Sequence, residues 1–425
     1  MNRPATVELT QTPDLTPLPA TTTGPDSQSG YAALRARWGQ IAPVEIEPGV
    51  PAWLVMGHAE IYRILRSEAL FSRDPRNWRW HRDGLLPDGA AILAYSPRRP
   101  RAASYHHDGA ERARLRAPLD AALGTLPEKA VLTTTREVCR RLIGEFGQTG
   151  RHELVGDYCR KVGFLAMAAM FGFDAGTSAR LMVDSGLTLG HGARAQEAQE
   201  RIAATLVAHV RQRRSAGAAD LTSALAHDRR FRSDVEIAET MAIPMHAAST
   251  FLTAWIAQTF HLILGDGPFG ARWTQGRISL DDLLEEVLWR ETPVANSPAP
   301  RYAMTDLRLD GKLIRTGDAL VLAIAAANGD PRIHTGDPWD ELGNRSHLAW
   351  GTGVHQCPAP RQARIIARVA VEELLQVADL RLLTLPGQTT WTASPWVRYP
   401  QRLPVEFRRV PRGRHTAVDT RPPAR

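Results

Sequence analysis

The size and composition of the chain are those of a globular protein with a sizeable core. Its 425 residues are 43% hydrophobic and 23% charged, and no run of about 18 uninterrupted apolar residues predicts a membrane span. The net charge of +7 comes from arginines scattered along the chain rather than from a basic tail, which disfavours a nucleic-acid partner. The chain has only three cysteines, which argues against a disulfide framework, so we expect a cytoplasmic protein.

The two ends of the chain differ from its middle. Residues 1–29 are rich in Pro, Thr, Ser and Gly and lack an apolar period, so we expect a disordered leader rather than a secretion signal. Residues 409–425 are expected to form a disordered tail. No linker or internal repeat interrupts residues 30–408, which we interpret as one catalytic domain.

Most of the elements expected along the chain are helices. Residues 44–47 and 53–56 predict a β-hairpin around a turn at Pro48 and Gly49. Apolar residues spaced three and four apart then predict helices. These helices span residues 110–123, 136–146, 158–173, 233–262 and 280–291. Short strands are expected at residues 307–309 and 320–324, so the fold class is mostly α with a minor β part.

The helix expected over residues 233–262 carries two further signals. Ser233 and Glu236 form a capping box that fixes its first turn. Pro244 lies inside the helix and lacks the N–H that the helical ladder needs, so we expect a kink there.

The most informative segment is the loop that contains Cys357. Residues 347–359 read His-Leu-Ala-Trp-Gly-Thr-Gly-Val-His-Gln-Cys-Pro-Ala. Gly351 and Gly353 remove side chains, so the backbone can approach a large flat partner and its amide groups can reach the cysteine sulfur. This pattern favours a cysteinate that donates electron density to haem iron.

Three alternatives for Cys357 were weighed. One cysteine and His355 are too few ligands for a closed zinc site, which takes four. A cysteine-hydrolase nucleophile has local signatures that this loop lacks. A structural buried cysteine is the commonest role for a single cysteine, but the ordered set of loop residues argues against it here.

The loop resembles the haem-binding loop of the cytochrome P450 family, in which an aromatic residue, two glycines, a basic residue and the axial cysteine follow in this order. Residues 325–331 and 403–405 are similar to the family's Ala-Asn-Arg-Asp-Pro turn and its closing strand. The resemblance covers residues 30–408. It implies the triangular, mostly α P450 fold with a minor β lobe, and haem b buried between the central long helix and the cysteine-loop helix. It also implies that Cys357 binds the iron and that further residues contact the haem: Trp350, Gly351, Gly353 and Ala359.

The resemblance also implies which cations bind the two haem carboxylates. In the family a His and an Arg four residues apart on one helix do so, with an Arg before a strand and the His of the cysteine loop. The matching residues here are Arg112, where the His is expected, Arg116, Arg301 and His355. A spacing of four places Arg112 and Arg116 on one helical face. Arg114 is expected on a solvated basic face.

The chain departs from the family at the Glu-x-x-Arg helix, whose ion pair braces the cysteine loop. Residues 285–290 read Glu-Glu-Val-Leu-Trp-Arg, so Trp289 occupies the position of the arginine. Arg290 lies four residues after Glu286, which leaves a helical ion pair open. This variant resembles a subgroup of bacterial members, and it bears on the rigidity of the haem pocket rather than on haem binding.

A second departure lies in the central helix, where the family uses an acid and a threonine to relay protons to oxygen. The best register places Thr250 at the acid and Phe251 at the threonine, and a shift by one residue restores a Thr but no acid. We therefore expect protons from water, from the substrate or from side chains of this window. The window comprises His246, Ala247, Ala248, Ser249, Thr250 and Phe251. Thr253 and Ala254 are expected to belong to a buried helix face.

Residues 77–82, with Tyr95 and Tyr105, lie where the family places its substrate lid. Their interleaved aromatic rings and cations predict a grip on a peptide or an aromatic acid. A packed surface loop is the alternative of equal weight. Trp396 is expected to close the pocket from the opposite side.

Together with the resemblance, these residues predict a monomeric haem-thiolate oxidoreductase that activates O2 with electrons from a ferredoxin-type partner. The incomplete relay favours oxidative cross-linking of aromatic side chains in a peptide-like natural product. The alternatives are C–H hydroxylation by a conventional monooxygenase and a non-catalytic haem-binding sensor or signalling partner. An acidic donor would dock on a cationic patch, for which the candidates are Arg112, Arg114, Arg361, Arg364 and Arg368.

Overall fold

The computed structural model describes residues 8–9, 12, 14–24, 26–188, 193–336, 339–385 and 387–411. Its internal contacts divide the chain into two compact units. The strand-rich unit comprises Met1–Ala113, Leu288–Cys357 and Thr392–Arg398, and the helical unit comprises Arg114–Val287, Pro358–Trp391 and Tyr399–Arg425. The boundaries fall inside two helices, α4 (Gly109–Thr125) and α13 (Leu280–Arg290).

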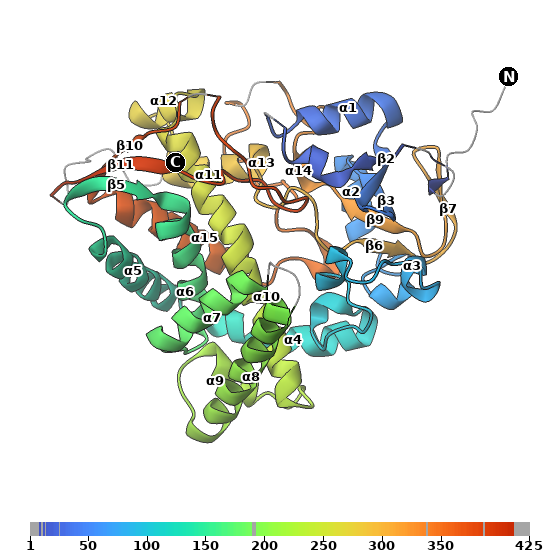
Figure 1. Ribbon diagram of the computed structural model, residues 1–425, viewed down its shortest axis with the longest axis horizontal. Helices are drawn as coiled ribbons and strands as arrows, with labels where there is room; N and C mark the ends of the chain where they lie inside the picture. Colours follow the sequence, from blue (N-terminus) through green and yellow to red (C-terminus); the bar gives the residue numbers. More distant parts are fainter. Residues whose placement is uncertain are drawn as a thin grey trace. The chain divides into compact units, whose positions relative to one another are not determined.

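The strand-rich unit is built on a six-stranded sheet with the order β1-β2-β3-β9-β6-β4, of which β2, β3, β9 and β6 are labelled in Figure 1. β2 and β3 form the expected antiparallel hairpin, with a bulge between Glu45 and Glu47, and β9 adds parallel to β3. Trp53, Val55 and Leu322 are fully buried, so the sheet carries the apolar core of this unit. The strands are β1 (Thr16–Pro17), β2 (Ile41–Glu47), β3 (Val50–Val55), β4 (Phe71–Ser72), β6 (Arg301–Ala303) and β9 (Ala319–Leu322).

Short helices and a two-stranded sheet complete the strand-rich unit. Ile61, Ile64 and Leu65 of α2 pack in the same apolar cluster as β3 and β9, which fixes this helix against the sheet. The elements are α1 (Ser29–Trp38), α2 (His58–Leu65), α3 (Arg79–Arg82), α14 (Ile324–Asn328), β7 (Leu307–Leu309) and β8 (Lys312–Ile314).

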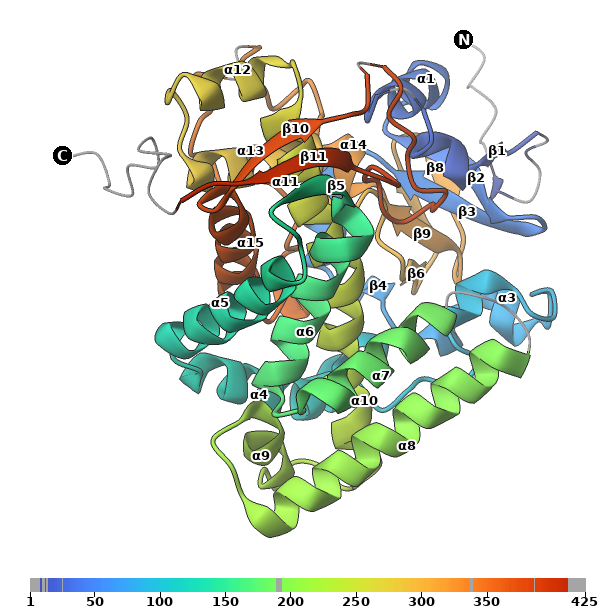
Figure 2. The same ribbon diagram turned by 60° about the vertical axis from the view of Figure 1, so that its left-hand side comes forward.

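The helical unit contains the longer helices and an antiparallel sheet with the order β10-β11-β5. α5 lies beside both α6 and α15 (Figure 2). The helices are α5 (Glu128–Gly144), α6 (Arg160–Met170), α7 (Ala175–Leu187), α8 (Ala193–Ala216), α9 (Leu221–Ala226), α10 (Asp234–Ala247), α11 (Thr253–Leu264), α12 (Pro268–Thr274) and α15 (Pro360–Leu375). The strands are β5 (Thr149–Glu153), β10 (Ala378–Leu382) and β11 (Pro404–Arg409).

The central helix of this unit is continuous from Asp234 to Leu264 but changes its hydrogen-bond pattern in the middle. After α10 a π-helical turn, η7 (Ala248–Leu252), leads into α11. Pro244 lies inside α10, four residues before the turn begins, and the kink expected at this proline stays a prediction. By length and composition the helix could cross a membrane, but 61% of its most apolar window is buried inside the structure, as in a core helix.

Several expected elements are confirmed close to their predicted bounds. They include the helices at residues 110–123 and 280–291 and the strands at 307–309 and 320–324, whereas the helix expected at 136–146 begins eight residues earlier, at Glu128. The Ser233 hydroxyl accepts a hydrogen bond from the Glu236 N–H at 3.2 Å, so the first half of the capping box is present. These elements are specified by local sequence, which is why periodicity finds them.

The disordered leader expected over residues 1–29 needs correction in its second half. Thr16 and Pro17 pair with β2, Leu18 is fully buried, and the Thr22 hydroxyl donates to the Ser394 carbonyl at 2.7 Å. One buried leucine and satisfied hydroxyl groups order a segment whose average composition suggests disorder. The tail was expected over residues 409–425. Arg409, its first residue, is the last residue of β11, and residues 412–425 lie outside the described residues. The single catalytic domain over 30–408 stays a prediction.

Candidate functional site

The backbone of the cysteine loop is shaped by its two glycines. Gly351 and Gly353 have φ angles of +64° and +72°, the left-handed region that strains other residues. A Cβ on Gly353 would also lie 2.5 Å from the carbonyl oxygen of Leu65, so α2 approaches the loop too closely for a side chain there. The Cys357 N–H donates to the Trp350 carbonyl at 2.8 Å. The loop is therefore a compact turn that ends at a partly buried cysteine.

Asn328 ties the cysteine loop to the end of α13. Its amide nitrogen donates to the Leu288 carbonyl at 2.8 Å, and its amide oxygen accepts from the Leu348 N–H at 2.8 Å. Because Asn328 is buried, loss of either bond would leave polar groups unsatisfied inside the protein. The turn at residues 325–331 thus holds the start of the cysteine loop in place.

Trp289 supports the same segment by packing and one hydrogen bond. Its indole N–H donates to the Asn344 carbonyl at 2.7 Å. Its ring meets the rings of His334 and His347 edge-on, with centroid distances of 5.4 Å and 5.5 Å. A buried aromatic cluster therefore stands at the position where the family uses an arginine. The Glu286–Arg290 ion pair stays a prediction.

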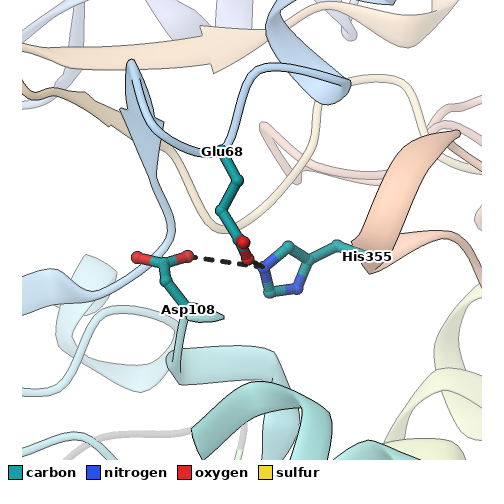
Figure 3. A group of neighbouring side chains, drawn as sticks. All are labelled: Glu68, Asp108 and His355. Atoms are coloured by element: carbon teal, nitrogen blue, oxygen red, sulfur yellow. Dashed lines mark ion pairs between the residues drawn. The ribbon is translucent and has the colours of Figure 1, made fainter. Parts of the chain in front are cut away.

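His355 lies between two carboxylates of the strand-rich unit (Figure 3). Its Nε2 atom is 3.5 Å from Asp108 and 3.6 Å from Glu68. Arg112 approaches the same Glu68 at 3.7 Å and donates to the Val354 carbonyl at 2.8 Å. The structure thus brings together two of the residues expected to bind the haem carboxylates, Arg112 and His355, and it adds two carboxylates to which the sequence patterns assigned no role.

Burial and hydrogen bonding set the charge of this cluster. Burial lowers the pKa of His355 to about 3, so its imidazole is neutral at physiological pH. Burial raises the pKa of Asp108, but the contact with His355 and hydrogen bonds from Ser72 and the Arg73 N–H outweigh this effect and lower the pKa to about 2. The ligand atoms of Glu68, Asp108 and His355 lie within 4.8 Å of one another, a spacing that a metal ion would also accept. Asp108 is nevertheless already engaged by Ser72 and Arg73.

Arg301 is a buried cation whose donors are not matched. It is 1% exposed, and within the described part of the chain its Nε and Nη2 atoms have no hydrogen-bond partner. Burial and then the charge of Arg73 lower its pKa to about 9, so it still carries its proton at neutral pH. Such a group needs an anion, and haem carries two carboxylates. The residues present therefore fit this cofactor: Arg301, Arg112 and His355 would bind its carboxylates and Cys357 its iron.

Arg116 and most of the expected docking arginines lie in the helical unit, where each faces an acid. Arg116 lies 2.6 Å from Asp120. The expectation of a solvated face for Arg114 is wrong, because its side chain is only 16% exposed and binds Glu236 through both terminal nitrogens. The other ion pairs are Arg361–Glu128 (2.6 Å), Arg364–Glu285 (2.6 Å) and Arg368–Asp281 (3.4 Å). These acids offset the charge that a docking patch would need. Ala359 directly precedes α15.

The residues expected to handle protons lie where α10 passes into η7. His246 is exposed, and the Ser249 hydroxyl donates to its carbonyl at 3.0 Å, so that hydroxyl serves the backbone. Thr250 and Phe251 are partly buried within the π-helical turn. As expected, Thr253 and Ala254 are fully buried.

The aromatic segment at residues 77–82 is largely packed into the strand-rich unit. Trp78 is fully buried and stacks on Tyr302 at a centroid distance of 5.7 Å. Arg79 pairs with the buried Asp318 at 2.7 Å. The packed-loop alternative therefore holds for these two side chains. Tyr95 meets Trp396 edge-on at 5.6 Å, so these two expected pocket residues are neighbours.

Three residues of this region had no sequence signal of their own. Glu68 and Arg73 flank β4 in one segment, whereas Asp108 lies some 35 residues further on, and the fold brings all three near His355 or Arg301. The one available signal was an arginine directly after a short strand, which periodicity cannot distinguish from a surface cation.

No protein-family model matches the chain. Among similar proteins, 2-hydroxy-5-methyl-1-naphthoate 7-hydroxylase of Streptomyces carzinostaticus is 28% identical over 398 residues, which cover 89% of this chain and 96% of the relative. Cytochrome P450 monooxygenase PikC of Streptomyces venezuelae is 26% identical and covers 90% and 92%. The solved structure of CYP154C4 from Streptomyces sp. W2061 superposes with a TM-score of 0.80 at 22% identity and covers 92% of this chain and 97% of that one. The mostly α fold with minor β sheets is thereby confirmed.

Proposed function

From the premise that this chain belongs to the cytochrome P450 family, as a bacterial-type monooxygenase-like oxidoreductase, we propose that it couples aromatic side chains oxidatively. Haem b with a cysteinate ligand supplies the activation of O2. In this proposal Cys357 binds the iron, while Arg301, Arg112 and His355 bind the haem carboxylates. The donor is a ferredoxin-type protein, and the enzyme works in the cytoplasm as a monomer in natural-product biosynthesis.

The observation that carries the proposal is the composition of η7. Its five residues, Ala248–Leu252, contain no acid, and Phe251 stands where the family has its threonine. Without a side-chain relay, protons must come from water or from the substrate. A phenol or imidazole substrate brings its own proton. In the coupling reaction the substrate gives up two hydrogens, a bond forms between its rings, and two donor electrons with two protons complete the reduction of O2 to two waters.

A second candidate is C–H hydroxylation, because the similar naphthoate protein is named a hydroxylase. Mass spectrometry separates the two reactions. Purified protein would be incubated with O2, NADH, a ferredoxin with its reductase, and a panel of short peptides that contain Tyr, Trp and His. Loss of two hydrogens is expected, whereas gain of one oxygen supports hydroxylation. No product together with no substrate-dependent NADH oxidation would contradict both and support the non-catalytic alternative.

A further inference from the structure

Two buried arginines flank the pairing of β4 with β6 at the edge of the six-stranded sheet. β4 and β6 are antiparallel, with Phe71 opposite Ala303 and Ser72 opposite Tyr302. Continued by one residue past the end of β4, this register would set Arg73 opposite Arg301, the first residue of β6, and the charge of Arg73 acts on Arg301. Like charges in directly opposite positions destabilise a sheet. This arrangement therefore requires something that compensates for it.

Within the described residues, neither guanidinium has a hydrogen-bond partner for every donor nitrogen. Arg301 is 1% exposed and Arg73 is 8% exposed. Among the residues that the structure describes, the Nε atoms of both and the Nη2 atom of Arg301 lack a hydrogen-bond partner. Unpaired donors on a buried cation are costly, and they persist where a ligand supplies the acceptors.

The nearby acids do not fill this role. Asp108 accepts from the backbone N–H of Arg73 at 2.9 Å and from the Ser72 hydroxyl, so its oxygens bind the chain around the arginine rather than the guanidinium. Glu68 lies near His355 and Arg112 instead. The two acids do add negative charge to the region where the haem carboxylates are expected, which makes an additional cation useful there.

Arg73 is also held in a fixed position. Its guanidinium lies over the ring of Tyr105, 4.1 Å from the ring centroid. Stacking on an aromatic face leaves the edge of the planar fork available for a bidentate carboxylate. The side chain therefore loses little further freedom when it binds an anion.

We propose that Arg73 and Arg301 together form a carboxylate-binding site, with Arg73 as a ligand outside the four cations that the family resemblance assigns. The carboxylate comes from haem or from an acidic substrate, and the first source rests on the proposed haem-binding function. A bidentate ligand between the two forks would offset their repulsion and accept from the unmatched nitrogens.

The test compares carboxylates with their esters. Full-length chain produced without haem precursor would be titrated with iron protoporphyrin IX and with its dimethyl ester, and separately, by calorimetry, with 1-naphthoate and its methyl ester. Arg73→Gln is the test variant. Arg76→Gln is the matched control, because Arg76 lies in the same segment but its side chain is 65% exposed and pairs with Asp74.

If haem supplies the carboxylate, Arg73→Gln weakens binding of the diacid about tenfold, as expected for loss of one charged hydrogen-bonding partner, and leaves binding of the diester unchanged. If a substrate supplies the carboxylate, Arg73→Gln leaves the ratio of affinities for iron protoporphyrin IX and its dimethyl ester unchanged. The same variant then loses the preference for 1-naphthoate over its methyl ester. Equal ratios in Arg73→Gln and Arg76→Gln for both pairs overturn the proposal.

Additional measurements cover two further outcomes: misfolding of Arg73→Gln and a wild type that binds no porphyrin. Should Arg73→Gln fail to fold, Arg73→Lys keeps the charge without the fork, and an acid-to-ester ratio equal to that of the wild type overturns the site. Should the wild type bind no porphyrin at all, the proposed function fails, while the 1-naphthoate titrations still decide the carboxylate site.

Discussion

The cysteine loop and the central helix have diverged from the family pattern to different degrees. The loop keeps both glycines in the left-handed region and keeps its cysteine, while η7 replaces the relay residues with Thr250 and Phe251. The backbone of the loop packs closely against α2 at Gly353, so a larger residue cannot be accommodated there. The relay carries no comparable packing demand, because water or substrate can supply protons. Under the proposed function, iron binding by the loop and proton delivery near η7 are separable requirements.

The largest expected effect comes from removing the sulfur. Cys357→Ser should abolish the thiolate-type absorption of the reduced CO complex, because serine cannot supply the electron-donating ligand. Absorption spectra of purified protein measure this. Cys159→Ala is the control, since Cys159 is fully buried in the helical unit, and it should keep the spectrum. An unchanged spectrum in Cys357→Ser would remove the basis for placing the iron at this loop.

The support beneath the loop can be broken at Trp289. Trp289→Ala should lower the free energy of unfolding by about 3–5 kcal/mol, because it deletes a buried aromatic side chain. Trp289→Phe should cost only about 1 kcal/mol, since it loses mainly the hydrogen bond to Asn344. Urea titration measures both, and the rate of haem loss should follow the same order. Equal stability of the alanine and phenylalanine variants would show that the packing contributes nothing.

The two glycines of the loop offer a matched pair. Gly353→Ala should destabilise the protein by about 2–5 kcal/mol, because a Cβ meets both the φ penalty and the Leu65 carbonyl. Gly351→Ala should cost only about 1–2 kcal/mol, since its Cβ would have no neighbour closer than 4.0 Å. Thermal unfolding with haem content as a second readout measures the difference. A larger loss for Gly351→Ala would contradict the close approach of α2.

The central helix can be tested by restoring the relay. Thr250→Glu combined with Phe251→Thr should raise the ratio of oxygen-gain products to coupled products several-fold. The reason is that side chains can then deliver protons to oxygen, and a well-positioned general acid accelerates a reaction by about 10²-fold or more. Product masses measure it. Thr253→Val is the control, as Thr253 is fully buried and its hydroxyl donates to the Ser249 carbonyl. A product ratio that does not respond would argue that this helix does not control proton delivery.

The last prediction concerns acid stability, and its effect vanishes at neutral pH. Burial, together with Arg101 and Arg73, lowers the pKa of His106 to about 3 from its ordinary 6.5. The folded protein binds this proton more weakly than the unfolded chain does, so stability should fall as pH decreases from about 6.5 towards 3. His106→Gln should flatten that slope in urea titrations at several pH values. His246→Gln, at an exposed position of the central helix, should leave the pH dependence of stability unchanged. If His246→Gln flattens this dependence and His106→Gln does not, His106 is not the group whose protonation destabilises the protein.

The sequence by itself determined the elements that local patterns specify. The hairpin at β2 and β3, the helices with three-and-four spacing and the glycines around Cys357 follow from turn chemistry, periodicity and backbone sterics. The sequence also shows that Trp289 and Phe251 depart from the family motifs, because each motif position has an expected residue.

Only the tertiary structure decided which distant residues meet. The pairing of β4 with β6 brings Arg73 next to Arg301, and Glu68 and Asp108 converge on His355 from separate segments. The same holds for the hydrogen bond that Trp289 makes to Asn344 and for the ordering of the leader by buried Leu18. Such contacts depend on burial and long-range register, which no window of neighbouring residues encodes.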